Sequence, residues 1–433
     1  MHSRSKTPSA NSDSEDSFSL PNSKFSLPPP ALVPKLRFPE FREAEGWQQK
    51  SLGNVATFFK GKGLPKSALS ADGKNPCIHY GELFTEYQEV IRSVRSRTNL
   101  AENVFLSVAN DVLMPTSDVT PSGLAKASCL NFENVILGGD ILVIRTEKES
   151  VNGEFLARYI RHLESKVLQL VSGSTVFHLY ASSMEKLALS FPKRPAEQQR
   201  IAECLSSLDE LIAAQARKLD ALKTHKKGLM QQLFPREGET QPRLRFPKFQ
   251  NAGEWEMKVL GDVVKSFKTG KLDANAMVEN GQYRFYTCAK NHYQIDNYAF
   301  EGEALLVAGN GAHLGYIHHY IGKFNAYQRT YVLQKFEANV VFLRCLLDRY
   351  LPSRIQFEKK DGNTPYIVLS TLTEMPLVIP KDPAEQQRIA DCLSSLDDLI
   401  AAQTQTVEAL KAHKQGLMQQ LFPGESLSAN TEK

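Results

Sequence analysis

The sequence predicts two globular domains in tandem, joined by two long helices that pair antiparallel as one coiled coil. Three observations lead to this fold class: a long segment occurs twice, each copy keeps a heptad period of apolar residues, and the regions before the two copies differ. The length of 433 residues fits roughly three units of ordinary domain size. A hydrophobic content of 42% and a charged content of 23% are typical of a soluble protein with real cores.

The first element, residues 1–34, is rich in Ser and Pro, which predicts a disordered leader. It lacks the apolar core of a secretory signal, and no apolar run in the chain approaches the ~20 residues of a membrane helix. The net charge of +4 and the pI near 8.5 permit nucleic-acid binding without requiring it. The six cysteines lack zinc-site spacing, so we expect them to act as small apolar side chains in a reducing cytosol. With neither a secretory signal nor a membrane helix predicted, we expect a cytoplasmic protein that binds no membrane.

Two globular regions follow, and each begins with the same short motif. LRFPEF at Leu36–Phe41 matches LRFPKF at Leu244–Phe249, and Trp47 matches Trp255. The offset between copies is 208 residues at these motifs but 188 at the later duplicated segments, so the second region is shorter. The expected divisions are a domain at 35–192, a helix at 193–235, a linker and second domain at 236–380, a helix at 381–423, and a flexible tail at 424–433.

The duplicated segments predict the two helices. Residues 195–235 and 383–423 share roughly four positions in five, and apolar residues recur along both at alternating spacings of four and three. Gln215 and Lys226 interrupt the first apolar stripe where Gln403 and Lys414 interrupt the second, and such polar positions can fix register. The predicted pairing residues are Ile201, Leu205, Leu208, Ile212, Leu219, Leu222, Leu229 and Leu233 in the first helix, and Ile389, Leu393, Leu396, Ile400, Val407, Leu410, Leu417 and Leu421 in the second.

End signals agree with these helices. Asp382, Pro383 and Glu385 occupy the positions of an N-cap, a first-turn proline and a capping-box acid, and Pro235 and Pro423 end the segments. An intermolecular coiled coil is the alternative. We favour antiparallel pairing within one chain, which relates the two domains by a pseudo-two-fold axis. A rod of roughly 50 Å would suit two readers of DNA whose sites lie one turn, about 34 Å, apart.

These residues match a known family. PAEQQRI at Pro195–Ile201 and again at Pro383–Ile389, together with stretches inside each domain, resembles the specificity subunits of type I restriction-modification systems. LMPTSDVT at 113–120 and ILGGDILVIRT at 136–146 are similar to one class of target-recognition domain, and residues 286–333 to another. The resemblance covers about residues 35–423, and the leader is longer than is usual in the family.

The resemblance implies two α/β (α+β) target-recognition domains, each reading one half of a bipartite and asymmetric target in double-stranded DNA. It also implies two adenine-methylating modification subunits docked along the helices, and restriction subunits that translocate DNA. The chain itself would then be a non-catalytic subunit with no cofactor, because S-adenosylmethionine, ATP and Mg²⁺ belong to the partner subunits. The helices would set the length of the spacer between the half-sites.

Candidate DNA contacts are side chains that can read base edges or neutralise phosphates from predicted turns. In the first domain, three arginines and a lysine form the densest basic group, and a Thr-Ser pair lies in a predicted turn. In the second domain the candidates lie in or beside turns between strands. The full set is Lys66, Arg92, Arg95, Arg97, Thr116, Ser117, Lys290, Asn291, His292, Asn310, His313, Gln328 and Arg329.

Two glycine-containing motifs suggest nucleotide binding but fit it poorly. The glycines of Gly309–Gly315 lack dinucleotide-binding spacing, and strand-like residues follow, so an Asn-Gly turn between strands is the better interpretation. Lys268–Lys271 is followed by Leu272, where a phosphate-binding loop requires Ser or Thr for magnesium. Neither motif supports a nucleotide site.

Two other functions stay open at this level. Asp348, Glu358 and Lys360 loosely imitate a magnesium-dependent nuclease triad, although a solvated run of charges explains them better. A DNA-binding scaffold or regulator outside any restriction system could use the same repeated frame.

Overall fold

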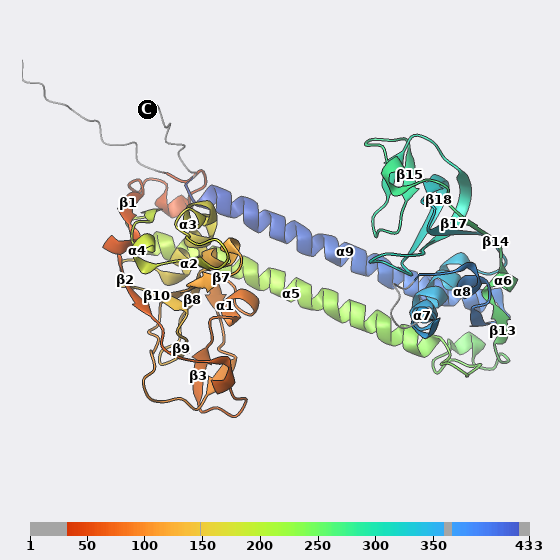
Figure 1. Cartoon of the computed structure of the whole chain (residues 1–433), viewed down its shortest axis with the longest axis horizontal. Helices are drawn as coiled ribbons and strands as arrows, with labels where there is room; N and C mark the ends of the chain where they lie inside the picture. The colour runs from red at the N-terminus through yellow and green to blue at the C-terminus, as the bar shows by residue number, and fades with distance from the viewer. Residues whose placement is uncertain (1–32, 148, 359–365, 424–433) are drawn as a thin grey trace, which may run out of the picture. The chain divides into compact units, whose positions relative to one another are not determined.

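The computed structural model describes residues 33–147, 149–358 and 366–423, which form two compact units (Figure 1). One unit comprises the chain up to Cys204 together with the residues from Gly416 onward, and the other is Leu205–Gln415. The predicted leader, apart from Val33 and Pro34, and the predicted tail lie outside the described residues. Among the described residues, no helix combines the length and the apolar character needed to span a bilayer.

The first unit combines short strands with short helices. Its elements are β1 (Gln48–Ser51), β2 (Ala56–Lys60), β3 (Asn75–Ile78), α1 (Glu82–Thr85), β4 (Val90–Ile91), β5 (Ser96–Thr98), β6 (Asp111–Pro115), β7 (Ser117–Asp118), β8 (Ser128–Leu130), β9 (Ile136–Leu137), β10 (Ile141–Thr146), α2 (Gly153–His162), α3 (Glu164–Leu168), β11 (Phe177–His178), α4 (Ala181–Met184), β12 (Ala188–Phe191) and the start of α5 (Pro195–Leu233). The main sheet has the order β2-β10-β6-β8-β4, a smaller sheet has the order β5-β3-β9, and β1-β12 and β7-β11 form pairs.

An aromatic group forms part of the core of this unit. Asn152 caps α2 by accepting a hydrogen bond from the backbone nitrogen of Phe155 at 2.9 Å. The Phe155 ring lies 5.8 Å from that of Trp47, and the Tyr159 ring stacks at 4.9 Å on Phe422. Phe422 follows the last helix of the chain, so the end of the second duplicated segment belongs to the core of the first domain.

The second unit is built around a larger sheet and the two long helices. Its elements are α5, β13 (Glu256–Val259), α6 (Leu260–Val263), β14 (Val264–Thr269), β15 (Tyr283–Tyr286), β16 (Tyr293–Ile295), β17 (Phe300–Ala308), β18 (Ile317–Ala326), β19 (Thr330–Phe336), α7 (Val340–Glu358), α8 (Leu369–Thr373), β20 (Pro376–Ile379) and α9 (Pro383–Leu421). The sheet has the order β14-β19-β17-β18-β15-β16, with β15 parallel to β18, and β13 pairs with β20.

The core of the second unit repeats the aromatic arrangement of the first. Asn339 caps α7 by accepting from the backbone nitrogen of Phe342 at 2.8 Å. The Phe342 ring lies 6.0 Å from Trp255 and 5.6 Å from Phe234, which follows α5. The end of the first duplicated segment therefore belongs to the second core. The first unit makes the same contacts with the corresponding residues, Asn152, Phe155, Trp47 and Phe422.

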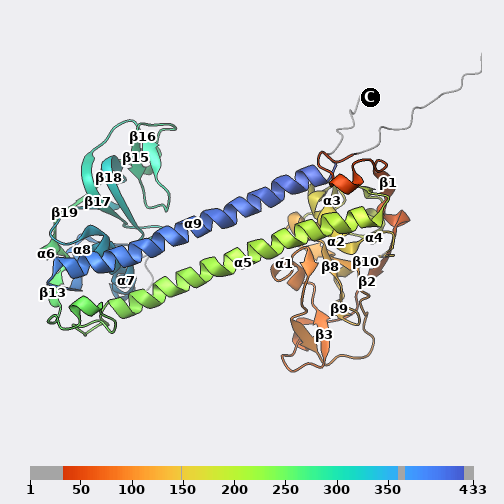
Figure 2. The same cartoon turned by 180° about the vertical axis from the view of Figure 1, so that it is seen from behind.

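Helices α5 and α9 lie side by side and run in opposite directions (Figures 1 and 2). Lys226 pairs with Asp397 at 2.5 Å, and Lys414 pairs with Asp209 at 2.6 Å. Between these pairs the Gln403 amide donates to the Gln215 side-chain oxygen at 2.8 Å. Exchanging the two copies converts one ion pair into the other, so the helix pair has the predicted pseudo-two-fold character. The fold class, two mixed α and β domains joined by antiparallel coiled-coil helices, is confirmed.

All the predicted pairing residues lie at buried or half-buried positions of α5 and α9. Leu211 and Leu399, which fall outside the heptad stripe, are 43% and 55% exposed. The difference follows from helix geometry, since a stripe of two positions per heptad can face only one partner.

The predicted capping box at the start of α9 is wrong for Glu385. Asp382 does cap the helix, by accepting from the backbone nitrogen of Ala384 at 2.9 Å. The Glu385 carboxylate instead receives both arms of Arg245, at 2.6 and 2.7 Å, and the indole N–H of Trp255 at 3.4 Å. We call these three residues the second clamp.

Its counterpart in the first unit, the first clamp, consists of Arg37, Trp47 and Glu197. Both arms of Arg37 reach the Glu197 carboxylate at 2.7 Å, and the indole of Trp47 donates to it at 3.3 Å. In each unit the acid of the PAEQQRI segment thus fixes the LRFP linker to the start of its own long helix.

Candidate nucleic-acid interface

Three loops of the large sheet in the second unit meet. They are residues 287–292 between β15 and β16, residues 309–316 between β17 and β18, and residues 327–329 between β18 and β19. The carbonyl oxygen of Arg329 accepts from the Gly309 backbone nitrogen at 2.9 Å and from the Cys288 thiol at 3.4 Å. One backbone oxygen therefore connects all three loops. We call them the reading loops.

Strand curvature explains why these loops meet. Ala308 at the end of β17 faces Thr330 at the start of β19, while the other end of β17 faces the end of β18 at Phe324. The turn at residues 327–329 joins the end of β18, beside the start of β17, to the start of β19, beside the end of β17. So short a turn can join these two strand ends only if the sheet coils strongly. A Cβ on Gly309 would lie 2.4 Å from the Arg329 oxygen, so this close approach requires glycine.

The structure brings all seven second-domain candidates to these loops. The residues 309–316 form the predicted turn between antiparallel strands. Five of the side chains are exposed, and Asn310 and His313 are half-buried. The candidates are Lys290, Asn291 and His292 in the first loop, Asn310 and His313 in the second, and Gln328 and Arg329 in the third. Their contact with bases stays a prediction.

Sequence reasoning missed neighbours of this surface. The Gln328 backbone nitrogen donates to Leu272 at 2.9 Å, which places exposed Lys271 beside the third loop. The Ile367 nitrogen donates to Gly309 at 2.9 Å, and Tyr366 beside it is 62% exposed. The Lys268–Lys271 motif carried a usable signal, two lysines close together.

The glycine of that motif has a packing role. A Cβ on Gly270 would lie 1.8 Å from the Ala326 carbonyl oxygen at the end of β18. Glycine is thus required for the close contact with the end of β18, and no phosphate ligand is needed to explain it.

Two histidines at the reading loops have lowered pKa values, which favours their neutral form. His292 lies at an exposed position, but partial desolvation of its ring, together with the charge of Arg284, lowers its pKa below the usual 6.5. Burial also lowers the pKa of His318, which lies on β18 next to the first loop. The histidines can therefore act as hydrogen-bonding groups here, while lysine and arginine supply the positive charge.

Two arginines of the basic group predicted in the first unit make contacts within that unit. Arg95 forms an ion pair with Glu86. Arg97 donates to the carbonyl oxygens of Gly73 and Lys74 at 2.7 and 2.8 Å, holding a turn. Both arginines nevertheless lie at exposed positions, and their contact with DNA stays a prediction.

Lys66 and Arg92 are exposed. Lys66 and Arg95 line a hollow of about 570 Å³ that also contains Glu82 and Glu86. The two carboxylates offset the positive charge of this hollow, so it is a weak site for phosphate.

Thr116 and Ser117 correct another prediction. Thr116 lies in a bend, with its backbone nitrogen bonded to Asp140 at 3.0 Å, but Ser117 lies in strand β7, paired with His178 of β11. The predicted turn is therefore wrong for Ser117. Both side chains are half-buried.

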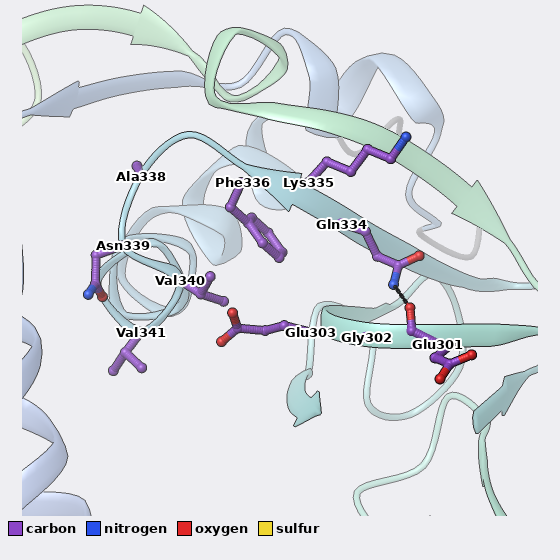
Figure 3. Close-up of a pocket in the computed structure, with 10 residues that line it drawn as sticks. All are labelled: Glu301, Gly302, Glu303, Gln334, Lys335, Phe336, Ala338, Asn339, Val340 and Val341. Atoms are coloured by element: carbon purple, nitrogen blue, oxygen red, sulfur yellow. Dashed lines mark hydrogen bonds between the residues drawn. The ribbon is translucent and has the colours of Figure 1, made fainter. Parts of the chain in front are cut away.

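Figure 3 shows a separate hollow of about 630 Å³ between β17, β19 and the start of α7. Glu301 and Glu303 line it with Lys335 and apolar side chains, and the Glu303 carboxylate contacts His319 at 2.8 Å. With two carboxylates and one lysine, this hollow suits DNA phosphates poorly.

The nuclease triad is not assembled among the described residues, and Lys360 lies outside them. Asp348 and Glu358 are on the same helix, α7, at positions roughly 15 Å apart along its axis. Asp348 contacts Arg344 at 3.7 Å, and Glu358 pairs with Arg354 at 2.7 Å. Within the described parts of the chain, no cluster of three or more His, Cys, Asp or Glu side chains could hold a metal ion.

Comparisons with known proteins agree with this geometry. The family model described as "Type I restriction modification DNA specificity domain" matches residues 44–224 and 252–412. The chain is 40% identical over 166 residues to the type I restriction enzyme EcoDI specificity subunit of Escherichia coli, a match covering 38% of this chain and 35% of that protein. It is 21% identical over 428 residues to the type I restriction enzyme MjaVIII specificity subunit of Methanocaldococcus jannaschii, covering 88% and 93%.

A solved structure has the same fold. The S subunit of a type I restriction-modification system from M. genitalium matches with a TM-score of 0.64 and 19% identity, covering 91% of this chain and 100% of that one. The fold extends across both units of the chain, whereas the strongest sequence identity is confined to a shorter stretch.

Proposed function

Because this chain belongs to the family of type I restriction-modification DNA specificity proteins, we propose that it selects the DNA site for a restriction-modification complex. One observation carries the proposal: two nearly identical frames hold domains with unlike loops. The two clamps and the two capped helices repeat, and the two main sheets share one strand order. The connections between corresponding strands differ: residues 309–316 and 327–329 in the second unit stand where residues 116–127 and 131–140 stand in the first. A repeated frame with different readers suits a bipartite, asymmetric target.

The reading loops supply the chemistry for the second half-site. Asn291, Asn310 and Gln328 carry amides that can pair with adenine, and Arg329 can pair with guanine. Lys271 and Lys290 can neutralise phosphates, which would make binding depend on salt. In the first domain, the four basic candidates, Lys66, Arg92, Arg95 and Arg97, all lie at exposed positions.

The remaining functions would belong to partners. Two modification subunits would dock along α5 and α9 and methylate adenine with S-adenosylmethionine, and restriction subunits would use ATP and Mg²⁺. This chain would contribute recognition and spacing, without a catalytic group of its own.

The test is to map methylated adenines in the host genome with and without this gene. We expect a bipartite motif that disappears with the gene. A second strain, in which residues 309–316 are replaced by a Gly-Ser loop of equal length, should lose specificity in one half of that motif only. Methylation that is unchanged in the deletion strain would refute the proposal.

A further inference from the structure

Two adjacent histidines on β18 have different surroundings. His318 faces the first reading loop, and its Nε2 lies 2.9 Å from the carbonyl oxygen of Ala289. His319 instead contacts Glu303 at 2.8 Å, at the hollow in Figure 3. Alternate residues of a strand face opposite sides of the sheet, so the pair provides a site and its own control.

The geometry around His318 fixes the orientation of its ring. The ring centroid lies 4.9 Å from that of Tyr286 and 4.9 Å from that of Tyr316. A carbonyl oxygen only accepts hydrogen bonds, so Nε2 must carry the hydrogen and donate it to Ala289. Rings on neighbouring elements thus hold one donor toward the middle of residues 287–292.

The other side-chain bonds of this loop are longer. Ala289 donates to Thr287 within the loop at 3.3 Å, and the Cys288 thiol, a weak donor, lies 3.4 Å from the Arg329 oxygen. Among the bonds described for the loop, the one from His318 is the shortest and comes from a strand in the middle of the sheet. Removing it should free the loop more than removing either of the others.

We propose that His318 is a positioning residue for DNA recognition: it holds the first reading loop so that Lys290, Asn291 and His292 keep a fixed arrangement beside Arg329. The inference rests on the proposed function, because it assigns a role within the same surface. His318 is half-buried and is not itself required to contact DNA.

The test uses the full chain with its modification subunits and compares His318→Phe, His318→Gln and His319→Phe. Phenylalanine keeps a ring between the two tyrosines but has no donor, whereas glutamine keeps a donor without the ring. Binding is measured on the duplex found by methylation mapping and on a random duplex of equal length. His318→Phe should lose about tenfold of the preference for the mapped duplex, the value of one base contact, while His318→Gln and His319→Phe stay close to wild type.

A second measurement follows the loop without DNA. Alkylation of Cys288 is timed by mass spectrometry against Cys392 in the same molecule, since both thiols are half-buried. We expect faster modification of Cys288 in His318→Phe only. Unchanged preference in the binding assay, or an unchanged Cys288 rate, would overturn the positioning role. A wild-type complex without preference for the mapped duplex would overturn the proposed function, and the alkylation rates would still decide whether His318 holds the loop.

Discussion

Replacing Glu385 with glutamine should destabilise the second unit far more than other charge removals on α9. The Glu385 carboxylate receives two bonds from Arg245 and one from the Trp255 indole. Glutamine has nearly the same size but no charge, and its amide would face the guanidinium with a donor. One arm of Arg245 would lose its acceptor, the other could still donate to the amide oxygen, and the bonds to the carbonyls of Ala252 and Gly253 would remain.

Burial sets the magnitude. The Arg245 and Glu385 side chains are 10% and 1% exposed, and removing one partner of such a pair costs about 3–5 kcal/mol, since a buried charge is left uncompensated. For a unit of this size, each kcal/mol corresponds to roughly 2–4 °C in Tm. The expected loss is on the order of 10 °C. Glu408→Gln is the control, because Glu408 pairs with Lys411 on the outside of the same helix, where the residues are 64% and 55% exposed and such pairs contribute less than about 1 kcal/mol.

The chain's two tryptophans make the assay local. Trp47 and Trp255 each belong to one clamp. In a Trp47→Phe background, guanidinium unfolding followed by fluorescence reports on Trp255 and therefore on the second unit. A midpoint for Glu385→Gln equal to that of Glu408→Gln would refute the reasoning that the clamp is a buried structural ion pair.

Three further predictions concern recognition, spacing and pH. Arg329→Ala, which leaves the Arg329 carbonyl in place, should weaken binding to the mapped duplex by about 1–3 kcal/mol but random DNA much less, as measured by fluorescence anisotropy; equal losses would reject base reading. One heptad can be inserted after Gln215 and another immediately before Gln403, which keeps both ion pairs in register and lengthens the helix pair by about 10 Å. The methylated motif should then gain a longer spacer, and an unchanged spacer would reject the role of the helices in setting its length. The folded-state pKa values of His292 and His318 are lowered, so both residues favour the neutral form. Their contribution to stability is present above the unfolded pKa of about 6.5 and is lost as the pH falls through the lower folded values. Between pH 7.5 and 5.5, urea unfolding should show a smaller loss of stability in the double variant His292→Gln, His318→Gln than in wild type, and an equal loss would contradict this assignment.

The long helices could be predicted because their signal is local and periodic. Each seam position recurs at heptad spacing, and the burial of Leu205 and Leu393 against the exposure of Leu211 and Leu399 follows from that spacing alone. Antiparallel pairing needed one further inference, that a duplicated stripe finds its partner within the chain.

Contacts between distant residues explain the failures. The position of Glu385 fits a capping box, but its partner Arg245 lies 140 residues earlier in the chain, and a buried bidentate ion pair is stronger than a bond to the helix end. Ser117 pairs with a strand that starts some 60 residues later, beyond the reach of local turn patterns. Arg97 also bonds to the carbonyls of Gly73 and Lys74, more than 20 residues earlier, which composition does not indicate.

The reading loops illustrate both sides of this limit. Their residues were predicted as turns from local sequence, but nothing in the sequence showed that the three turns meet. Their meeting depends on the coiling of β17 and β18 and on the hydrogen bond from Gly309 to Arg329. For the same reason Tyr366 was missed, since the bonds of Ile367 to Gly309 and Tyr331 hold it beside the reading loops.

The two units assign their polar side chains differently, and this bears on how specificity could change. Each clamp uses the same trio of Arg, Trp and Glu at corresponding positions to fix linker and helix, so changes within a domain need not disturb the frame. Inside the domains, Arg95 and Arg97 are tied to acids and carbonyls of the first unit, whereas the side chains of Lys290 and Arg329 extend from exposed loop positions in the second. If both domains read DNA, they must do so with different sets of side chains. Exchange of a whole domain between its clamp residues should therefore alter one half-site without altering the other.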